Sequence, residues 1–183
     1  MTSPTGDCLA GYYCVSGSDR ANPLMLNDTQ CPTGTVHPII GHQCPAGHYC
    51  PIGSEYPIGC PAGSYQDLTN QNHCKACPLG HYCYANTSDY TPNICPGGYY
   101  CELNTTDIYQ YPCPPGTFNN LTQQHSIAAC ESCTQGMYCQ GHGNAYPTGN
   151  CSAGWYCTNG SDTAQVRPFT AGGKSWVFSE TVR

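Results

Sequence analysis

A seven-residue motif, Cys-x-x-Gly-x-Tyr-Cys, constrains the fold of this chain more than any other feature. It occurs six times, beginning at Cys8, Cys44, Cys77, Cys95, Cys133 and Cys151. A longer relative, Cys-Pro-x-Gly-x followed by an aromatic residue or Val, begins at Cys31, Cys60 and Cys113. Recurrence of one short motif predicts an array of small similar modules rather than one globular domain.

Two long copies of the repeat align cysteine for cysteine. Cys60, Cys74, Cys77, Cys83, Cys95 and Cys101 match Cys113, Cys130, Cys133, Cys139, Cys151 and Cys157. The offset is 53 residues at the first cysteine and 56 at the other five, so the first loop of the second copy holds a three-residue insertion. We therefore expect partial, degenerate repeats over 1–59, full repeats over 60–112 and 113–157, and a cysteine-free tail over 158–183.

The composition explains why such modules need cross-links. Leu, Ile, Val and Phe make up about 12% of the chain, whereas 17 of its 183 residues are cysteine. So few aliphatic side chains cannot offset the conformational entropy of folding by burial alone. This composition excludes a Rossmann domain, a barrel enzyme and a helical bundle. A membrane span is also excluded, because no run of about 18 apolar residues occurs.

The recurring residues between the cysteines also have physical roles. The glycine, as at Gly47 and Gly80, lies midway between two cysteines, where a tight turn needs a positive φ or a close backbone approach. The tyrosine, as at Tyr49 and Tyr82, can cover a disulfide with its ring while its hydroxyl stays in water. We expect these rings to replace the missing aliphatic core.

The segments CPAGSYQDLTNQNHCKACPLGHYC and CPPGTFNNLTQQHSIAACESCTQGMYC resemble ephrin-receptor-like and growth-factor-receptor cysteine-rich repeats, and tumour-necrosis-factor-receptor modules more distantly. The resemblance covers roughly residues 8–157. It implies a small disulfide-rich fold in which irregular β-hairpin modules stack into an elongated rod with little helix. It also implies disulfides between the first and second, third and fifth, and fourth and sixth cysteines, namely Cys60–Cys74, Cys77–Cys95, Cys83–Cys101, Cys113–Cys130, Cys133–Cys151 and Cys139–Cys157.

The N-terminal part departs from this pattern. Its five cysteines allow two disulfides and leave one thiol over, among Cys8, Cys14, Cys31, Cys44 and Cys50. The odd cysteine could pair upstream of residue 1, pair with another chain, or stay a free exposed thiol.

The cysteine density indicates an oxidising compartment, because thiols in such number would be a liability in the cytosol. Six sequons for N-glycosylation point the same way: Asn27, Asn86, Asn104, Asn120, Asn150 and Asn159. The N-terminal MTSPTGDC carries no signal-peptide pattern, which favours an internal piece of a longer chain over a processed one. We expect an extracellular or cell-surface location with covalent N-linked glycans.

The chain lacks the motifs of catalysis and of nucleic-acid binding. The five Lys and Arg residues are scattered and the net charge is −6, which excludes a phosphate-binding surface. The CxxC pairs ending at Cys77 and Cys133 lie inside repeats whose other cysteines supply disulfide partners, so we expect no zinc. With no nucleophile, hydrolase or P-loop signature present, we expect no enzyme activity and no cofactor.

The tail after Cys157 differs in character. Residues 174–182 are rich in β-forming side chains and follow a flexible Ala-Gly-Gly segment. Trp176, Val177 and Phe178 would have nothing of their own to pack against, so this strand could add to the sheet edge of a neighbouring copy. The alternatives are a tail folded on its own last module and the start of a further domain.

Two classes of function fit these observations. The first is a non-enzymatic extracellular structural glycoprotein, a subunit or segment of a filament, coat or matrix that contacts head-to-tail copies of itself or neighbouring glycoproteins. Shaft glycoproteins of flagellar hairs (mastigonemes) carry similar repeats and are one comparison. The alternative is the ligand-binding or stalk region of a cell-surface receptor. The sequon load favours the structural function, because glycans would obstruct a broad ligand face.

Overall fold

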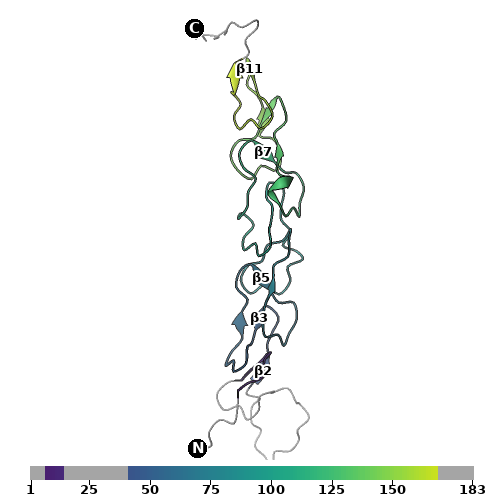
Figure 1. Ribbon diagram of the computed structural model, residues 1–183, viewed down its shortest axis with the longest axis vertical. Helices are drawn as coiled ribbons and strands as arrows, with labels where there is room; N and C mark the ends of the chain where they lie inside the picture. The colour runs from purple at the N-terminus through teal and green to yellow at the C-terminus, as the bar shows by residue number, and fades with distance from the viewer. Residues whose placement is uncertain (1–6, 15–40, 169–183) are drawn as a thin grey trace, which may run out of the picture. The chain divides into compact units, whose positions relative to one another are not determined.

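The computed structural model describes residues 7–14 and 41–168, and every structural statement below concerns these residues. Its regular elements are short strands and one turn of 3-10 helix (Figure 1). In chain order they are β1 (Tyr12–Cys14), β2 (Gly41–Gln43), β3 (His48–Tyr49), β4 (Ile58–Gly59), β5 (Ser64–Tyr65), β6 (Lys75–Ala76), β7 (Thr117–Phe118), the 3-10 helix η1 (Ile127–Ala129), β8 (Glu131–Ser132), β9 (Met137–Tyr138), β10 (Gly149–Asn150), β11 (Trp155–Tyr156) and β12 (Arg167–Pro168).

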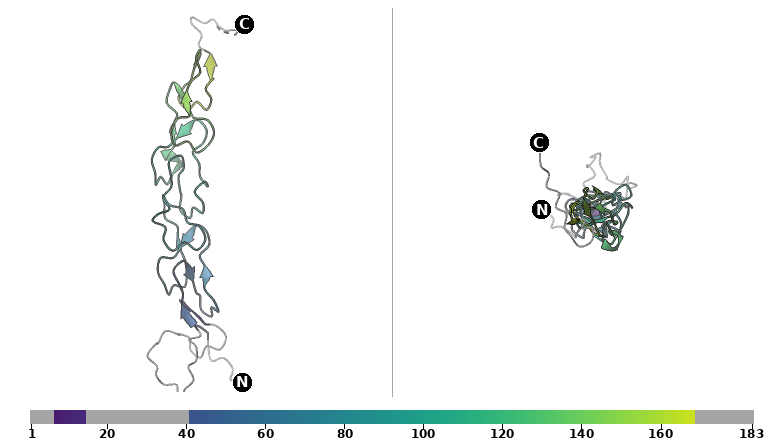
Figure 2. Two further views of the ribbon diagram at one scale, coloured as in Figure 1. Left: turned by 180° about the vertical axis from the view of Figure 1, so that it is seen from behind. Right: turned by 90° about the horizontal axis from the view of Figure 1, so that it is seen from above.

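Every strand pairs with its neighbour in the sequence, and every pair is antiparallel. The six two-stranded sheets, β1–β2, β3–β4, β5–β6, β7–β8, β9–β10 and β11–β12, do not join into a larger one (Figure 2). The predicted fold of disulfide-rich tandem β-hairpins with little helix is therefore confirmed for the described residues.

Each hairpin begins inside a seven-residue segment that we call a cysteine turn. The described residues contain eight of them, numbered 1 to 8, beginning at Cys8, Cys44, Cys60, Cys77, Cys95, Cys113, Cys133 and Cys151. Position 4 is always glycine. Position 7 is cysteine except in cysteine turns 3 and 6, where it is Gln66 and Asn119.

The strand register is the same after each of the first seven cysteine turns. Position 5 pairs with the residue just before the next position-1 cysteine, as His48 pairs with Gly59. Cysteine turns 4 and 5 have a single bridge each, His81↔Ile94 and Tyr99↔Pro112, in that same register. The hairpins are thus copies of one another.

Two compact units divide the chain. The first comprises Met1–Pro78, Tyr82–Asn93 and Leu103–Asp107, and the second comprises Leu79–His81, Ile94–Glu102 and Ile108–Arg183. The repeat boundaries expected after residues 59, 112 and 157 stay predictions, as does the stacking of modules into an elongated rod.

Four backbone hydrogen bonds connect each cysteine turn to the next, and we call this set the backbone ladder. Two of them involve the position-4 glycine. Gly63 N–H donates to the Cys83 carbonyl at 2.8 Å, and the Gly63 carbonyl accepts from Cys77 N–H at 2.9 Å. The equivalent pair of bonds recurs at all seven steps, with lengths between 2.7 and 3.1 Å.

The other two bonds involve a left-handed residue, three or four positions after position 7, and the residue that follows it. Asn86 (φ 62°) donates its N–H to the Cys60 carbonyl at 2.8 Å, and the Thr87 carbonyl accepts from Gln66 N–H at 3.0 Å. The same bonds recur at each step, and the left-handed residues are Gly53, Asn70, Asn86, Asn104, Gln123, Gly143 and Gly160. Every ladder bond joins two residues of the same compact unit.

The interior of the described chain is built from half-cystines. Every buried hydrophobic residue in it is a cysteine: Cys8, Cys44, Cys50, Cys60, Cys77, Cys83, Cys95, Cys101, Cys113, Cys133, Cys139 and Cys157. The tyrosines expected to cover the disulfides are half-buried, except for Tyr156, which is exposed. Three of these rings pack on other aromatic rings, namely Tyr13, Tyr82 and Tyr100. Tyr100 stacks on Tyr111 with ring centroids 5.4 Å apart.

Eight disulfides join the sixteen described cysteines, and they correct part of the expected pairing. Cys60–Cys74 and Cys113–Cys130 form as the resemblance implies. The expected bonds Cys77–Cys95, Cys83–Cys101, Cys133–Cys151 and Cys139–Cys157 are replaced by Cys77–Cys83, Cys95–Cys101, Cys133–Cys139 and Cys151–Cys157.

The physical reason lies within each cysteine turn. The chain reverses at the position-4 glycine, which brings positions 1 and 7 to a Cα–Cα distance of 5.8 Å in both Cys77–Cys83 and Cys95–Cys101. That distance lies within the range that a disulfide spans, so each turn closes on itself. Cys8–Cys14 and Cys44–Cys50 close in the same way. Of the five N-terminal cysteines, these two disulfides leave Cys31 as the one over, and it lies outside the described residues.

Candidate functional site

Two long loops break the otherwise uniform series of cysteine turns. Where position 7 is not cysteine, the position-1 cysteine pairs further along the chain, 14 residues on in Cys60–Cys74 and 17 in Cys113–Cys130. The other disulfides span 6 residues. We call residues 66–74 the Gln66 loop and residues 119–130 the Asn119 loop. In both loops a buried amide side chain adds hydrogen bonds to those of the ladder.

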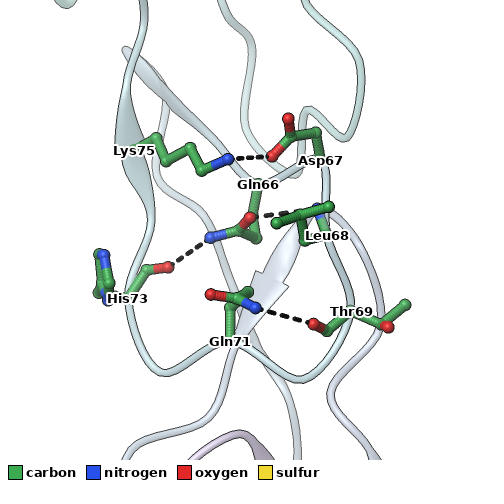
Figure 3. Close-up of polar contacts among 7 residues, drawn as sticks. All are labelled: Gln66, Asp67, Leu68, Thr69, Gln71, His73 and Lys75. Carbon is green, nitrogen blue, oxygen red and sulfur yellow. Dashed lines mark hydrogen bonds and ion pairs between the residues drawn. The ribbon is translucent and has the colours of Figure 1, made fainter.

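Gln66 holds its loop from inside. Its side chain is fully buried, its Oε1 accepts from Leu68 N–H at 3.1 Å, and its Nε2 donates to the His73 carbonyl at 2.8 Å. Figure 3 shows the amide lying across the middle of the loop between these two partners. Because both polar ends of a buried amide are paired, the loop keeps one backbone conformation.

Asn119 has the same role in the second loop. It is 2% exposed, its Oδ1 accepts from Leu121 N–H at 3.0 Å, and its Nδ2 donates to the Tyr99 carbonyl at 3.2 Å. The shorter asparagine thus ties its loop to cysteine turn 5, whereas Gln66 ties its loop to itself. In both loops the amide oxygen accepts from the backbone N–H two residues further on. The loops differ in the carbonyl to which the amide nitrogen donates.

Both loops expose a leucine beside a threonine at the same place. Leu68 is 53% exposed and Leu121 is 58% exposed. Behind each of them a glutamine closes the turn, with Gln71 Nε2 donating to the Thr69 carbonyl (Figure 3) and the equivalent Gln124 bond to Thr122 present in the second loop. An apolar side chain on a fixed backbone offers a contact surface whose ordering cost is already met by folding.

The charged groups beside the two loops differ. In the Gln66 loop, Lys75 Nζ lies 2.5 Å from Asp67 Oδ1 (Figure 3). This hydrogen bond holds the pKa of Asp67 below and the pKa of Lys75 above their ordinary values. The strand register places Glu131 opposite Phe118 where Lys75 lies opposite Tyr65. The second loop therefore carries a carboxylate where the first carries an ammonium group.

Burial also shifts the pKa of Tyr65, which directly precedes the Gln66 loop. Desolvation, followed by the neighbouring Tyr90 and Asp67, raises the pKa of the Tyr65 hydroxyl above its ordinary value. Lys75 Nζ lies 5.8 Å from the centre of the Tyr65 ring, within the range of a cation–π contact. Tyr65, Asp67 and Lys75 thus form one charged and aromatic cluster next to the exposed leucine.

All sixteen described cysteines are in disulfides. Within 7–14 and 41–168, no three His, Cys, Asp or Glu side chains come together as metal ligands would. The polar atoms of the two buried amides are paired with backbone groups, whereas the leucines of both loops are exposed.

The structure places five of the six predicted glycosylation sites on the surface. Asn86, Asn104, Asn120, Asn150 and Asn159 are exposed, and Asn27 lies outside the described residues. Asn86 and Asn104 are also left-handed residues of the backbone ladder, with φ of 62° and 64°. Their backbone N–H groups are used by the ladder, while the residues themselves are exposed. Occupancy stays a prediction.

The predicted tail is partly incorporated into the last cysteine turn. Gly160 N–H donates to the Cys133 carbonyl, and the Ser161 carbonyl accepts from Cys139 N–H, both at 2.9 Å. The start of the segment 158–183 therefore completes cysteine turn 8. The predicted contact residues Trp176, Val177 and Phe178 lie outside the described residues.

Sequence reasoning did not single out Gln66 and Asn119, although a signal was present. Gln66-Asp-Leu-Thr and Asn119-Asn-Leu-Thr are 53 residues apart and begin where the motif lacks its second cysteine. A polar residue at that position must satisfy its own hydrogen bonds when buried, which points to a bridging amide.

The comparisons with known proteins leave the chain without an assigned family. No protein-family model matches it, and no curated protein matches it either. The likeness to ephrin-receptor-like and growth-factor-receptor repeats therefore stays a prediction. In the described part, no helix has the length and apolar character needed to cross a bilayer.

Proposed function

We propose that this chain is a segment of a non-enzymatic extracellular structural glycoprotein, part of a filament, coat or matrix. The observation that carries the proposal is the backbone ladder, repeated at seven steps around an interior whose buried hydrophobic residues, among those described, are all half-cystines. Disulfides in such number support an extracellular or secreted location.

The ladder suits a structural role for a physical reason. Each cysteine turn is tied to the next through backbone atoms, so the outward side chains can vary without loss of the connection. Repeats that interact with their nearest neighbours build long objects from a short sequence unit. The exposed sequons would coat such an object with glycans, which would obstruct a broad ligand face.

The alternative function is recognition by a receptor stalk or ectodomain, and the two long loops favour it. Leu68 and Leu121 are exposed on fixed backbones, and the neighbouring charges differ, with Lys75 beside one loop and Glu131 beside the other. Duplicate apolar tips with different charged flanks could engage two sites on one partner.

Electron microscopy of the native material tests the structural proposal. We expect copies to associate into filaments or a continuous layer at physiological salt, and mild reduction of the same sample to disperse them. Separate particles of monomer mass, measured by light scattering at the native concentration, would refute the structural function and favour the receptor function.

A further inference from the structure

The eight disulfides of the described residues do not join one cysteine turn to the next. Six of them close a turn on itself, and Cys60–Cys74 and Cys113–Cys130 each close a turn with its own long loop. Successive turns are connected by the main chain and by the hydrogen bonds of the backbone ladder. One pair of side chains, Tyr65 and Tyr90, spans such a step with groups that oxidation can join covalently.

The two rings come from different turns and lie against each other. Tyr65 is at position 6 of cysteine turn 3, Tyr90 lies in the loop after cysteine turn 4, and both belong to the first compact unit. Their ring centroids are 4.6 Å apart and their planes are inclined by 61°. This separation is at the short end of the range of about 4.5–7 Å for aromatic pairs. The edge of one ring therefore faces the other ring, an arrangement in which two ring carbons can approach.

The backbone beside each ring is held in place. Tyr65 forms a parallel bridge with Thr87, which ties cysteine turn 3 to the segment that leads to Tyr90. On either side of Tyr90, the Thr91 N–H donates to Asp89 Oδ1 at 2.9 Å. Both tyrosines are half-buried, so part of each ring remains in contact with solvent. Two groups fixed side by side in this way react with each other in preference to groups on separate molecules.

We propose that Tyr65 and Tyr90 form a site of oxidative cross-linking, at which a haem peroxidase with hydrogen peroxide produces a dityrosine bond. Each phenol gives up one electron and one proton, and the two radicals form a carbon–carbon bond between positions ortho to the oxygens. Each of these carbons then transfers its hydrogen to the phenolic oxygen as a proton, which restores both aromatic rings. The two electrons and two protons reduce the peroxide to two molecules of water. The bond would join cysteine turn 3 to the segment after cysteine turn 4, and it does not depend on the proposed function.

Oxidation of the full chain at low protein concentration, with a haem peroxidase and hydrogen peroxide, tests the proposal. After reduction, alkylation and cleavage before aspartate, we expect residues 28–66, which hold Tyr65, to be joined to residues 89–106, which hold Tyr90. The joined pair should weigh two hydrogens less than the sum of its parts, show dityrosine fluorescence and keep its yield on dilution. Tyr65→Phe and Tyr90→Phe keep the packed rings but remove a phenol oxygen, so each should abolish the joined pair.

The matched control is Tyr56→Phe. Tyr56 lies in the same fragment as Tyr65, is 67% exposed and has no ring contact among the described residues. This variant should leave the yield of the joined pair unchanged. Survival of the pair in Tyr65→Phe, its loss in Tyr56→Phe, or its absence from a chain whose Tyr56 has been oxidised would overturn the proposal. A yield that rises with protein concentration would also overturn it, because the bond would then join two copies.

Discussion

At the scale of the residue, position 4 of the cysteine turn requires a positive φ and, in most turns, room for a neighbouring backbone, and glycine meets both requirements. Gly63 has a φ of 83°, a conformation that costs other residues about 1–2 kcal/mol. A Cβ built there would lie 2.5 Å from the carbonyl oxygen of Asn104, two turns further on. Both the backbone conformation and the close approach therefore keep this position free of a side chain, whereas position 5 tolerates residues from Ser64 to Trp155.

A pair of alanine variants separates these two demands. Gly116→Ala should lower the free energy of unfolding by about 3 kcal/mol or more, because its Cβ would lie 2.3 Å from the Gly160 carbonyl oxygen in addition to the unfavourable φ of 79°. Gly136→Ala, with a φ of 87° and nothing within 4 Å, should lower it by about 1–2 kcal/mol. Denaturant unfolding without reductant measures both, and equal losses would contradict the close approach.

The ion pair of the Gln66 loop gives a pH prediction with a defined sign. The Lys75 hydrogen bond lowers the pKa of Asp67 in the folded chain. Its contribution is therefore present above the ordinary aspartate pKa and is lost as the pH falls through the lowered folded value. Lys75→Met should raise the pKa of Asp67 toward its ordinary value, measured by carbon-detected NMR titration.

A second carboxylate serves as the internal control for that titration. Hydrogen bonds from the Thr91 side chain and backbone lower the pKa of Asp89, without any lysine. Lys75→Met should leave Asp89 unchanged. A rise of both pKa values by the same amount would show that Lys75 acts through the overall charge rather than through its contact with Asp67.

At the scale of the element, the repeating piece is one hairpin with its cysteine turn, shorter than the six-cysteine repeat. The backbone ladder recurs at each turn, from Cys44 N–H on the Gly11 carbonyl to Cys151 N–H on the Gly136 carbonyl. The six-cysteine pattern arises because every third turn in part of the chain replaces its position-7 cysteine with Gln66 or Asn119. Those replacements create the two long loops, which the longer disulfides Cys60–Cys74 and Cys113–Cys130 close.

Digestion before aspartate residues under non-reducing conditions tests the pairing within each turn. Cleavage at Asp89 and Asp107 releases residues 89–106, which hold Cys95 and Cys101. With the observed disulfides this fragment should separate freely and weigh two hydrogens less than its reduced form. If Cys95 and Cys101 were bonded as the resemblance implies, it would stay linked to residues 67–88 until reductant was added, which would contradict the structure.

At the scale of the whole molecule, stability depends on cross-links in place of an aliphatic core. The buried positions of the described chain hold half-cystines and small or polar residues, while apolar side chains such as Ile52 and Leu103 are exposed. In the simplest loop-entropy model a disulfide that closes about 15 residues contributes about 3 kcal/mol. Cys60–Cys74 and Cys113–Cys130 close loops of about this size, and the six disulfides that span 6 residues each contribute less. Together the eight bonds supply stability that burial does not.

Reduction should therefore unfold the chain rather than loosen it. We expect dithiothreitol at neutral pH to abolish the protease resistance of residues 41–168 and to collapse amide protection along the ladder, because no packed apolar layer remains to hold the turns. Proteolysis followed by mass spectrometry, with an alkylated but unreduced sample as control, measures the effect. Retained resistance after full reduction would show a core that the burial pattern lacks.

The hairpin class and the cysteine interior can be predicted from the sequence, because a Cys-x-x-Gly-x-Tyr-Cys turn is local and its glycine and cysteines encode it directly. The tertiary structure decided which cysteines pair. Cys95 N–H bonds to the Gly80 carbonyl, so each turn lies against its neighbour, and spacing alone cannot tell whether Cys95 closes with Cys101 or with another turn. The one-turn period of the ladder is likewise seen only in the folded chain. Its hydrogen bonds join backbone N–H and carbonyl groups, and every residue except proline carries both, so no side-chain pattern in the sequence marks them.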